Sequence, residues 1–84
     1  MTTMTHDLKV WPEFFRPLIE GRKTFELRRN DRNFQEGDKL CLREWSPLLD
    51  NYTHDVTHRR ITYVLHGPAF GLEKGFCILG LGPL

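Results

Sequence analysis

The sequence predicts a small, mainly β domain (class α+β) with one short helical segment near its N-terminus. The chain has 84 residues, which suffices for one hydrophobic core and is too short for two. Five segments show the alternation of polar and apolar residues typical of half-buried strands, and turn residues separate them at short intervals. Five short strands joined by tight turns favour a strongly bent sheet or small barrel with the helix packed against it.

The composition is that of an ordinary globular protein and excludes several functions. Hydrophobic residues make up 39% of the chain, and the formal net charge is +1. Bulk attraction to nucleic acid or membrane is therefore not expected, and any charge-driven function must be local. No apolar run approaches the roughly 18–20 residues that cross a bilayer. Two cysteines and no secretory signal pattern predict a cytoplasmic protein with reduced thiols.

The N-terminal part is predicted to contain one strand and one short helix. Residues 1–5 are expected to be disordered, and one domain is expected to span 6–84. Residues 6–10 alternate as a half-buried strand does. Pro12 suits the start of a helix, whereas Pro17 lacks an amide hydrogen and predicts a kink or two separate turns. Four apolar residues are expected on one helical face: Phe14, Phe15, Leu18 and Ile19.

The remaining strands are predicted at 24–28, 40–44, 55–66 and 76–81. In the first of them, Phe25 and Leu27 alternate with polar residues and are expected to face the core. Tyr63 is also expected in the core. The other predicted interior residues are Leu40, Leu42, Ile61, Leu65 and Ile78.

A basic segment, residues 22–32, is the strongest candidate for a functional site. It contains five basic and two acidic side chains, so its net charge is +3. On a strand, Glu26 and Arg28 project to the same side. Basic donors beside one carboxylate suit a phosphate together with a base edge or a sugar hydroxyl. The alternative is an internal ion-pair network of Glu26, Arg28 and Arg32 that only stiffens the fold.

The stretch from Gly21 to Arg28 also resembles a known signature. Gly21, Lys23, Glu26 and Arg28 match all positions of GxKxxExR, the signature of the ASCH domain in the PUA-like β-barrel superfamily. The likeness extends over roughly residues 6–81 and is closest to short ASCH-like proteins of bacteria and phages. It implies a five-stranded barrel whose cleft binds RNA or a modified nucleoside. The expected ligand-binding residues are Lys23, Glu26, Arg28 and Arg32, with Trp11 and Trp45 as aromatic partners for a base.

Two alternative functions remain. Some ASCH proteins hydrolyse N4-acetylcytidine with a lysine in the signature, a threonine three residues later and a distant glutamate. Lys23 matches the lysine, but Glu26 stands at the threonine position and the later segment is a short loop with Glu73. In such an enzyme Lys23 and Glu26 would be catalytic. The second alternative is a phage-type accessory protein that binds a host protein.

Neither a cofactor nor a metal ion is expected. His54 and His58 are four residues apart, but they lie at a loop–strand junction, where this spacing does not bring two ligands together. Cys41 and Cys77 lie within strand patterns and are expected to be small apolar residues of the wall.

Overall fold

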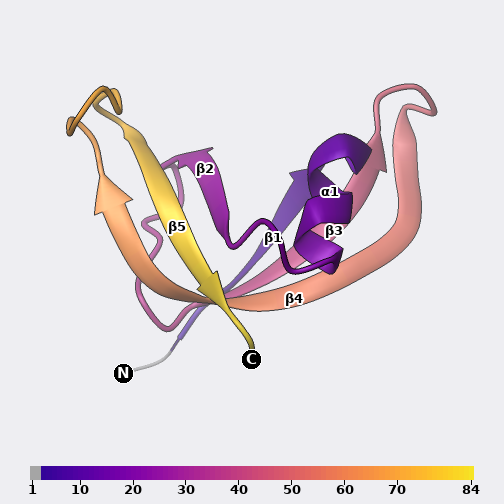
Figure 1. The fold of residues 1–84 in the computed structure, drawn as a ribbon, viewed down its shortest axis with the longest axis horizontal. Helices are drawn as coiled ribbons and strands as arrows, with labels where there is room; N and C mark the ends of the chain where they lie inside the picture. The colour runs from indigo at the N-terminus through magenta and orange to yellow at the C-terminus, as the bar shows by residue number, and fades with distance from the viewer. Residues whose placement is uncertain (1–2) are drawn as a thin grey trace.

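The computed structural model describes residues 3–84 and contains five strands and one helix (Figure 1). In chain order the elements are β1 (Thr5–Val10), α1 (Pro12–Ile19), β2 (Phe25–Arg29), β3 (Lys39–Ser46), β4 (Asn51–His66) and β5 (Phe76–Gly82). The strands form one sheet in the order β1-β3-β4-β5-β2. β1 pairs parallel to β3, and the other pairs are antiparallel. The predicted class, a mainly β domain of five strands with one short helix, is confirmed.

The sheet curls into a half-barrel because β4 is long and bent. β4 has 16 residues and runs through both arms of the molecule (Figure 1). It pairs first with β3 and then with β5, and each pairing contains a register shift, between Arg43 and Trp45 and between Ile61 and Tyr63. Such irregularities bend a strand and increase its twist. The curl turns the edge strands, β1 and β2, toward each other.

The core is built from the concave side of this sheet and one stripe of α1. Phe15 and Leu18 of the helix are buried against it, and Phe34 fills the interior from the segment between β2 and β3. The other members of the core are Leu8, Val10, Leu40, Leu42, Ile61, Val64, Cys77 and Leu79. Burying these side chains stabilises the fold at roughly 25 cal/mol per Å² of apolar surface.

The predicted orientation of β2 is wrong. Phe25 and Leu27 are 47% and 56% exposed, whereas Glu26 is only 4% exposed. Alternation defines two faces of a strand but does not say which face is inside. Here the inward carboxylate is acceptable because Lys23 and Arg28 pair with it.

The structure also differs from the prediction in which residues of β4, β5 and α1 are buried, and in the continuity of α1. Tyr63 is 59% exposed, because the register shift after Ile61 reverses the alternation and brings Val64 into the core. In β5 the opposite face is buried, so that Cys77 and Leu79 are inside while Ile78 and its partner Leu65 are only half-buried. On the helix, Phe14 and Ile19 are about half exposed, and α1 continues through Pro17 as a single helix.

The residue before β1 is bonded to the sheet region, and both cysteines are buried. β1 begins at Thr5, one residue before its predicted start, and the Met4 backbone N–H donates to Asp38. Residues 1–2, part of the segment expected to be disordered, lie outside the described residues. Cys41 and Cys77 are free and buried, as expected for residues of the wall. Within residues 3–84, no helix has the length and apolar character to cross a membrane.

Candidate functional site

A groove with a volume of about 730 Å³ lies between the end of β1, the start of α1 and β2. Three half-exposed aromatic side chains line it, those of Trp11, Phe14 and Phe25. Because Glu26 lines the groove and is itself buried, its carboxylate belongs to the floor. We call this the aromatic groove; its remaining lining residues are Lys9, Val10, Lys23, Leu27, Arg28 and Arg29. Its volume lies within the range of small-molecule sites, about 300–1,000 Å³.

The floor of the aromatic groove is an ion network centred on Glu26. Lys23 Nζ contacts Glu26 Oε1, and Arg28 Nε donates to Glu26 Oε2 at 3.1 Å. The Glu26 side chain is 5% exposed, against 17% for Lys23 and 26% for Arg28. Two cations thus hold one buried carboxylate and leave a net charge of +1 that is partly open to the groove.

A glycine-dependent turn places Lys23 beside this carboxylate. Gly21 follows the end of α1 with φ +78°, a left-handed conformation that favours glycine. The Gly21 N–H donates to Leu18 O, and the Arg22 N–H donates to Pro17 O. This is the Schellman pattern that ends many helices. The glycine of the signature therefore ends α1, and the chain turns directly into the lysine.

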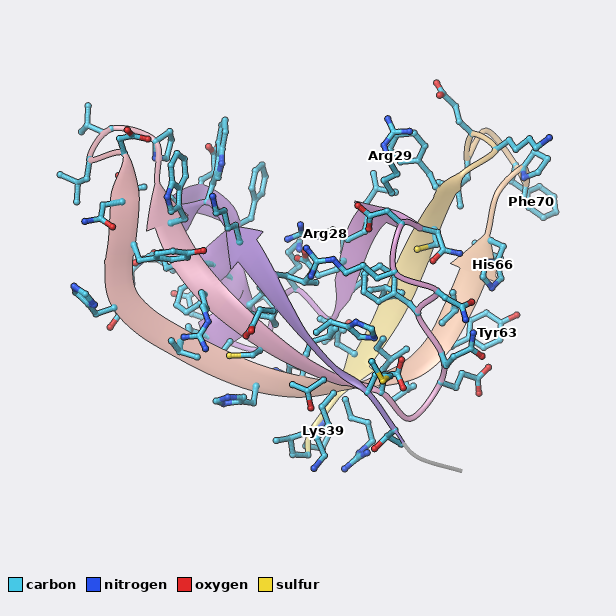
Figure 2. All side chains as sticks on the ribbon, turned by 180° about the vertical axis from the view of Figure 1, so that it is seen from behind. Arg28, Arg29, Lys39, Tyr63, His66 and Phe70 are labelled. Atoms are coloured by element: carbon cyan, nitrogen blue, oxygen red, sulfur yellow. The ribbon has the colours of Figure 1, made fainter. Side chains whose placement is uncertain are left out.

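The two edge strands meet beside the aromatic groove through arginine side chains. Arg28 donates to the backbone carbonyl of Lys9, and Arg32 donates to that of Asp7. Both acceptors belong to β1, whereas Arg28 is in β2 and Arg32 follows it. We call this line of contact between β1 and β2 the seam. Figure 2 shows Arg28 in the middle of the molecule, between the two arms.

The structure brings most of the predicted ligand-binding residues together. Trp11, Lys23, Glu26 and Arg28 all line the aromatic groove. Arg32 instead lines a second, smaller hollow along the seam, so it is not a partner of Glu26 in one network. The predicted internal ion network is present for the other two residues.

Trp45 differs from the prediction in its surroundings. It lines neither of these two hollows, and Lys9 Nζ lies over its ring, 5.0 Å from the ring centre. Such a position is a cation–π contact, which occupies one face of the ring. Trp45 therefore contacts Lys9, a residue of both hollows that was not predicted from the sequence.

Sequence reasoning missed Phe14, Phe25 and Leu27 as groove residues because it placed them in the core. The available signal was the signature itself. If its glutamate faces inward beside its lysine and arginine, the apolar residues between them must face outward. Among residues 3–84, no group of three or more His, Cys, Asp or Glu side chains is arranged to hold a metal ion.

Fold and site together define a class: a small β half-barrel with a ligand-sized groove beside the seam of its edge strands. A family model described as "Domain of unknown function (DUF3850)" matches residues 5–81, and the chain belongs to this family. Over 64 residues, 76% of the chain, it is 40% identical to the "Uncharacterized 12.9 kDa protein in GpA 3'region" of Escherichia phage P2. The match spans 57% of that relative's length.

Proposed function

We propose that the protein is an RNA-binding module of the PUA-like type that holds one nucleotide in the aromatic groove. The observation that carries this proposal is the pairing of half-exposed aromatic walls with a buried, ion-paired carboxylate at the floor. Single-stranded RNA is recognised mainly by stacking its bases on aromatic side chains and by hydrogen bonds to their edges. The match to the ASCH signature at Gly21, Lys23, Glu26 and Arg28 supports the same proposal.

Each part of the groove has a role in this proposal. Trp11 and Phe14 offer ring faces, and Phe25 adds a third ring with Lys23 Nζ 5.0 Å from its centre. Stacking on an aromatic ring contributes about 1–3 kcal/mol per base. Glu26 can accept a hydrogen bond from an amino group or a ring N–H of the base. The lining residues carry four positive charges and one negative charge, net +3, on a chain whose total is only +1. Attraction of an anionic ligand is therefore concentrated at the groove.

The geometry favours binding over hydrolysis. Attack on an acyl group, or abstraction of a proton, requires the neutral amine of a lysine. Lys23 instead forms an ion pair with Glu26. In an ion pair the lysine is an ammonium ion and not a neutral amine. Glu73 lies in the loop between β4 and β5 and is not among the residues that line the groove.

The test is a titration of the protein with a single-stranded RNA octamer of mixed sequence, followed by backbone amide shifts in NMR spectra. The expected shifts cluster on β2, the end of β1 and the start of α1. Phe25→Ala should weaken binding about 5- to 150-fold, from the loss of one stacking contact. Phe70→Ala is the matched control, since Phe70 is also an exposed aromatic residue but lies in the loop between β4 and β5 and does not line the groove (Figure 2). Shifts that cluster elsewhere, or equal losses in both variants, would contradict the proposal.

A further inference from the structure

A second hollow with a volume of about 250 Å³ adjoins the aromatic groove along the seam. Lys9 and Arg28 line both, so one ligand can extend from one into the other. We call it the basic hollow; its other lining residues are Asp7, Leu8, Arg32, Arg43 and Tyr52. It contains four positive side chains and one negative side chain, net +3, in a third of the volume of the aromatic groove.

We propose that the basic hollow binds the phosphate group of the nucleotide whose base occupies the aromatic groove. This inference rests on the proposed function and narrows the ligand class to nucleoside phosphates, free or within RNA, in preference to nucleosides. Three of the cations are arginines, whose planar guanidinium groups match the geometry of phosphate oxygens. The two ends of the site thus differ: an aromatic end for the base and a basic end for the anion.

The arginines of the basic hollow are already held in place. Arg28 and Arg32 each donate to a backbone carbonyl of β1, which fixes both guanidinium groups at the seam. A guanidinium has five N–H donors, so Arg28 keeps donors for a ligand even though its Nε also donates to Glu26, and Arg32 keeps donors as well. Binding an anion here therefore requires little further ordering of side chains, which lowers its entropic cost.

Asp7 occupies the position that an anionic ligand would take beside Arg43. Asp7 Oδ1 accepts a hydrogen bond from Arg43 Nε at 3.2 Å, and the two side chains are 67% and 43% exposed. An exposed pair of this kind is weak, so a phosphate can displace the carboxylate. Asp7 is then a competitor of the ligand, and its removal should strengthen phosphate binding.

The experiment compares ribonucleosides with their 5′- and 3′-monophosphates in titrations followed by NMR. One of the two phosphate positions is expected to bind about 10-fold more tightly than the nucleoside, as one set of charge-assisted hydrogen bonds predicts. Arg43→Gln should remove most of this advantage, whereas Lys39→Gln should leave it intact. Both are basic residues of β3, but Lys39 lies at the base of the molecule, away from Arg28 (Figure 2).

Asp7→Asn supplies a readout of opposite sign. It should tighten binding of the favoured monophosphate about 2- to 5-fold and leave nucleoside binding unchanged. A variant that merely perturbs the fold would weaken both ligands. Loss of affinity for the monophosphate in Asp7→Asn would therefore contradict the assignment.

The results that overturn this inference differ from those that overturn the proposed function. The inference is wrong if neither monophosphate exceeds the nucleoside, or if the advantage persists in Arg43→Gln. It is also wrong if inorganic phosphate alone binds as tightly as the monophosphate, because the hollow would then be a general anion site. The proposed function fails separately, when neither nucleosides nor RNA shift the signals of the aromatic groove.

Discussion

Glu26 connects the stability of β2 with the chemistry of the aromatic groove. Its carboxylate is buried, and Lys23 and Arg28 supply both of its charged partners. Burying a carboxylate costs several kcal/mol unless such partners are present. Lys23 and Arg28 make the inward orientation of Glu26 possible. Together with Glu26 they form the polar floor of the groove, which we propose contacts the ligand.

Glu26→Gln is expected to destabilise the protein by about 2–3 kcal/mol. This is somewhat less than the cost of breaking a fully buried ion pair, because the side chains of Lys23 and Arg28 remain partly exposed to solvent. The amide retains the volume of the side chain but leaves both cations without a counter-charge. Urea unfolding at pH 7 measures the loss. Glu36→Gln, at an exposed position in the turn before β3, is the control and should change stability by less than about 0.5 kcal/mol. Equal values for the two variants would show that the network does not stabilise β2.

Lys23→Arg separates a binding role from a catalytic one. If Lys23 only contacts an anion and Glu26, arginine supplies the same charge, and RNA affinity should fall by less than about 10-fold. Because Lys23 is ion-paired, we also expect no release of acetate from N4-acetylcytidine by the unmodified protein. Acetate is measured over several turnovers in both proteins. Turnover that Lys23→Arg abolishes would replace the binding proposal with the hydrolase alternative.

At the scale of the elements, the turn that ends α1 determines where Lys23 lies. Gly21 has φ +78°, and a Cβ built there meets nothing within 4 Å. Gly21→Ala should therefore cost about 1–2 kcal/mol through backbone strain alone. Gly71, in the loop between β4 and β5, is a matched control with φ +89° and equally free surroundings.

Both glycine variants are expected to lose similar stability in thermal or urea unfolding. Only Gly21→Ala should also weaken RNA binding, because its strain displaces the Lys23 backbone, whereas Gly71 lines neither hollow. A Gly21→Ala protein that binds RNA as tightly as Gly71→Ala would show that the turn does not position the site.

The positions of the strands and the helix were easier to predict from the sequence than which face of each element is buried. Polar and apolar alternation located all five strands, but in β2 the alternation could not distinguish an apolar interior from an interior ion network. In β4 the register shift after Ile61 reverses which residues face the core, and no residue type in the sequence marks its position. The grouping of Lys23, Glu26 and Arg28 in one place could be predicted from the sequence, because the signature is local. Its aromatic walls were not, since they depend on how β1 and α1 fold back onto β2.

At the scale of the whole molecule, a buried polar pair holds the start of the chain to the sheet. His6 Nε2 lies 2.9 Å from Asp38 Oδ2, and both side chains are almost fully buried. Asp38 also accepts hydrogen bonds from the backbone N–H groups of Met4 and Gln35. Burial raises the pKa of Asp38, but the hydrogen bonds from His6, Met4 and Gln35 outweigh it and hold the pKa below its ordinary value of 3.8.

This lowered pKa makes part of the stability dependent on pH. Because the pKa of Asp38 is lower in the folded state than in the unfolded chain, its contribution is fully present above about pH 4 and declines as the pH falls through the folded pKa. Asp38→Asn should therefore be less stable than the unmodified protein at pH 7, with a difference that shrinks in acid. Urea unfolding from pH 7 down to pH 2.5 tests this. A difference that stays constant over the whole range would contradict the assignment.

The arginine hydrogen bonds along the seam also affect how readily the sheet edges can aggregate. The edge of a sheet presents unpaired backbone groups that a strand from another molecule can extend, which leads to aggregation. Here β1 and β2, the two edges, are turned toward each other. Arg28 and Arg32 already occupy the carbonyl groups of Lys9 and Asp7 that an incoming strand would need. The two arginines at the proposed binding site therefore also hinder the pairing of β1 with a strand of another molecule. A variant without both arginines would expose these carbonyl groups and aggregate more readily.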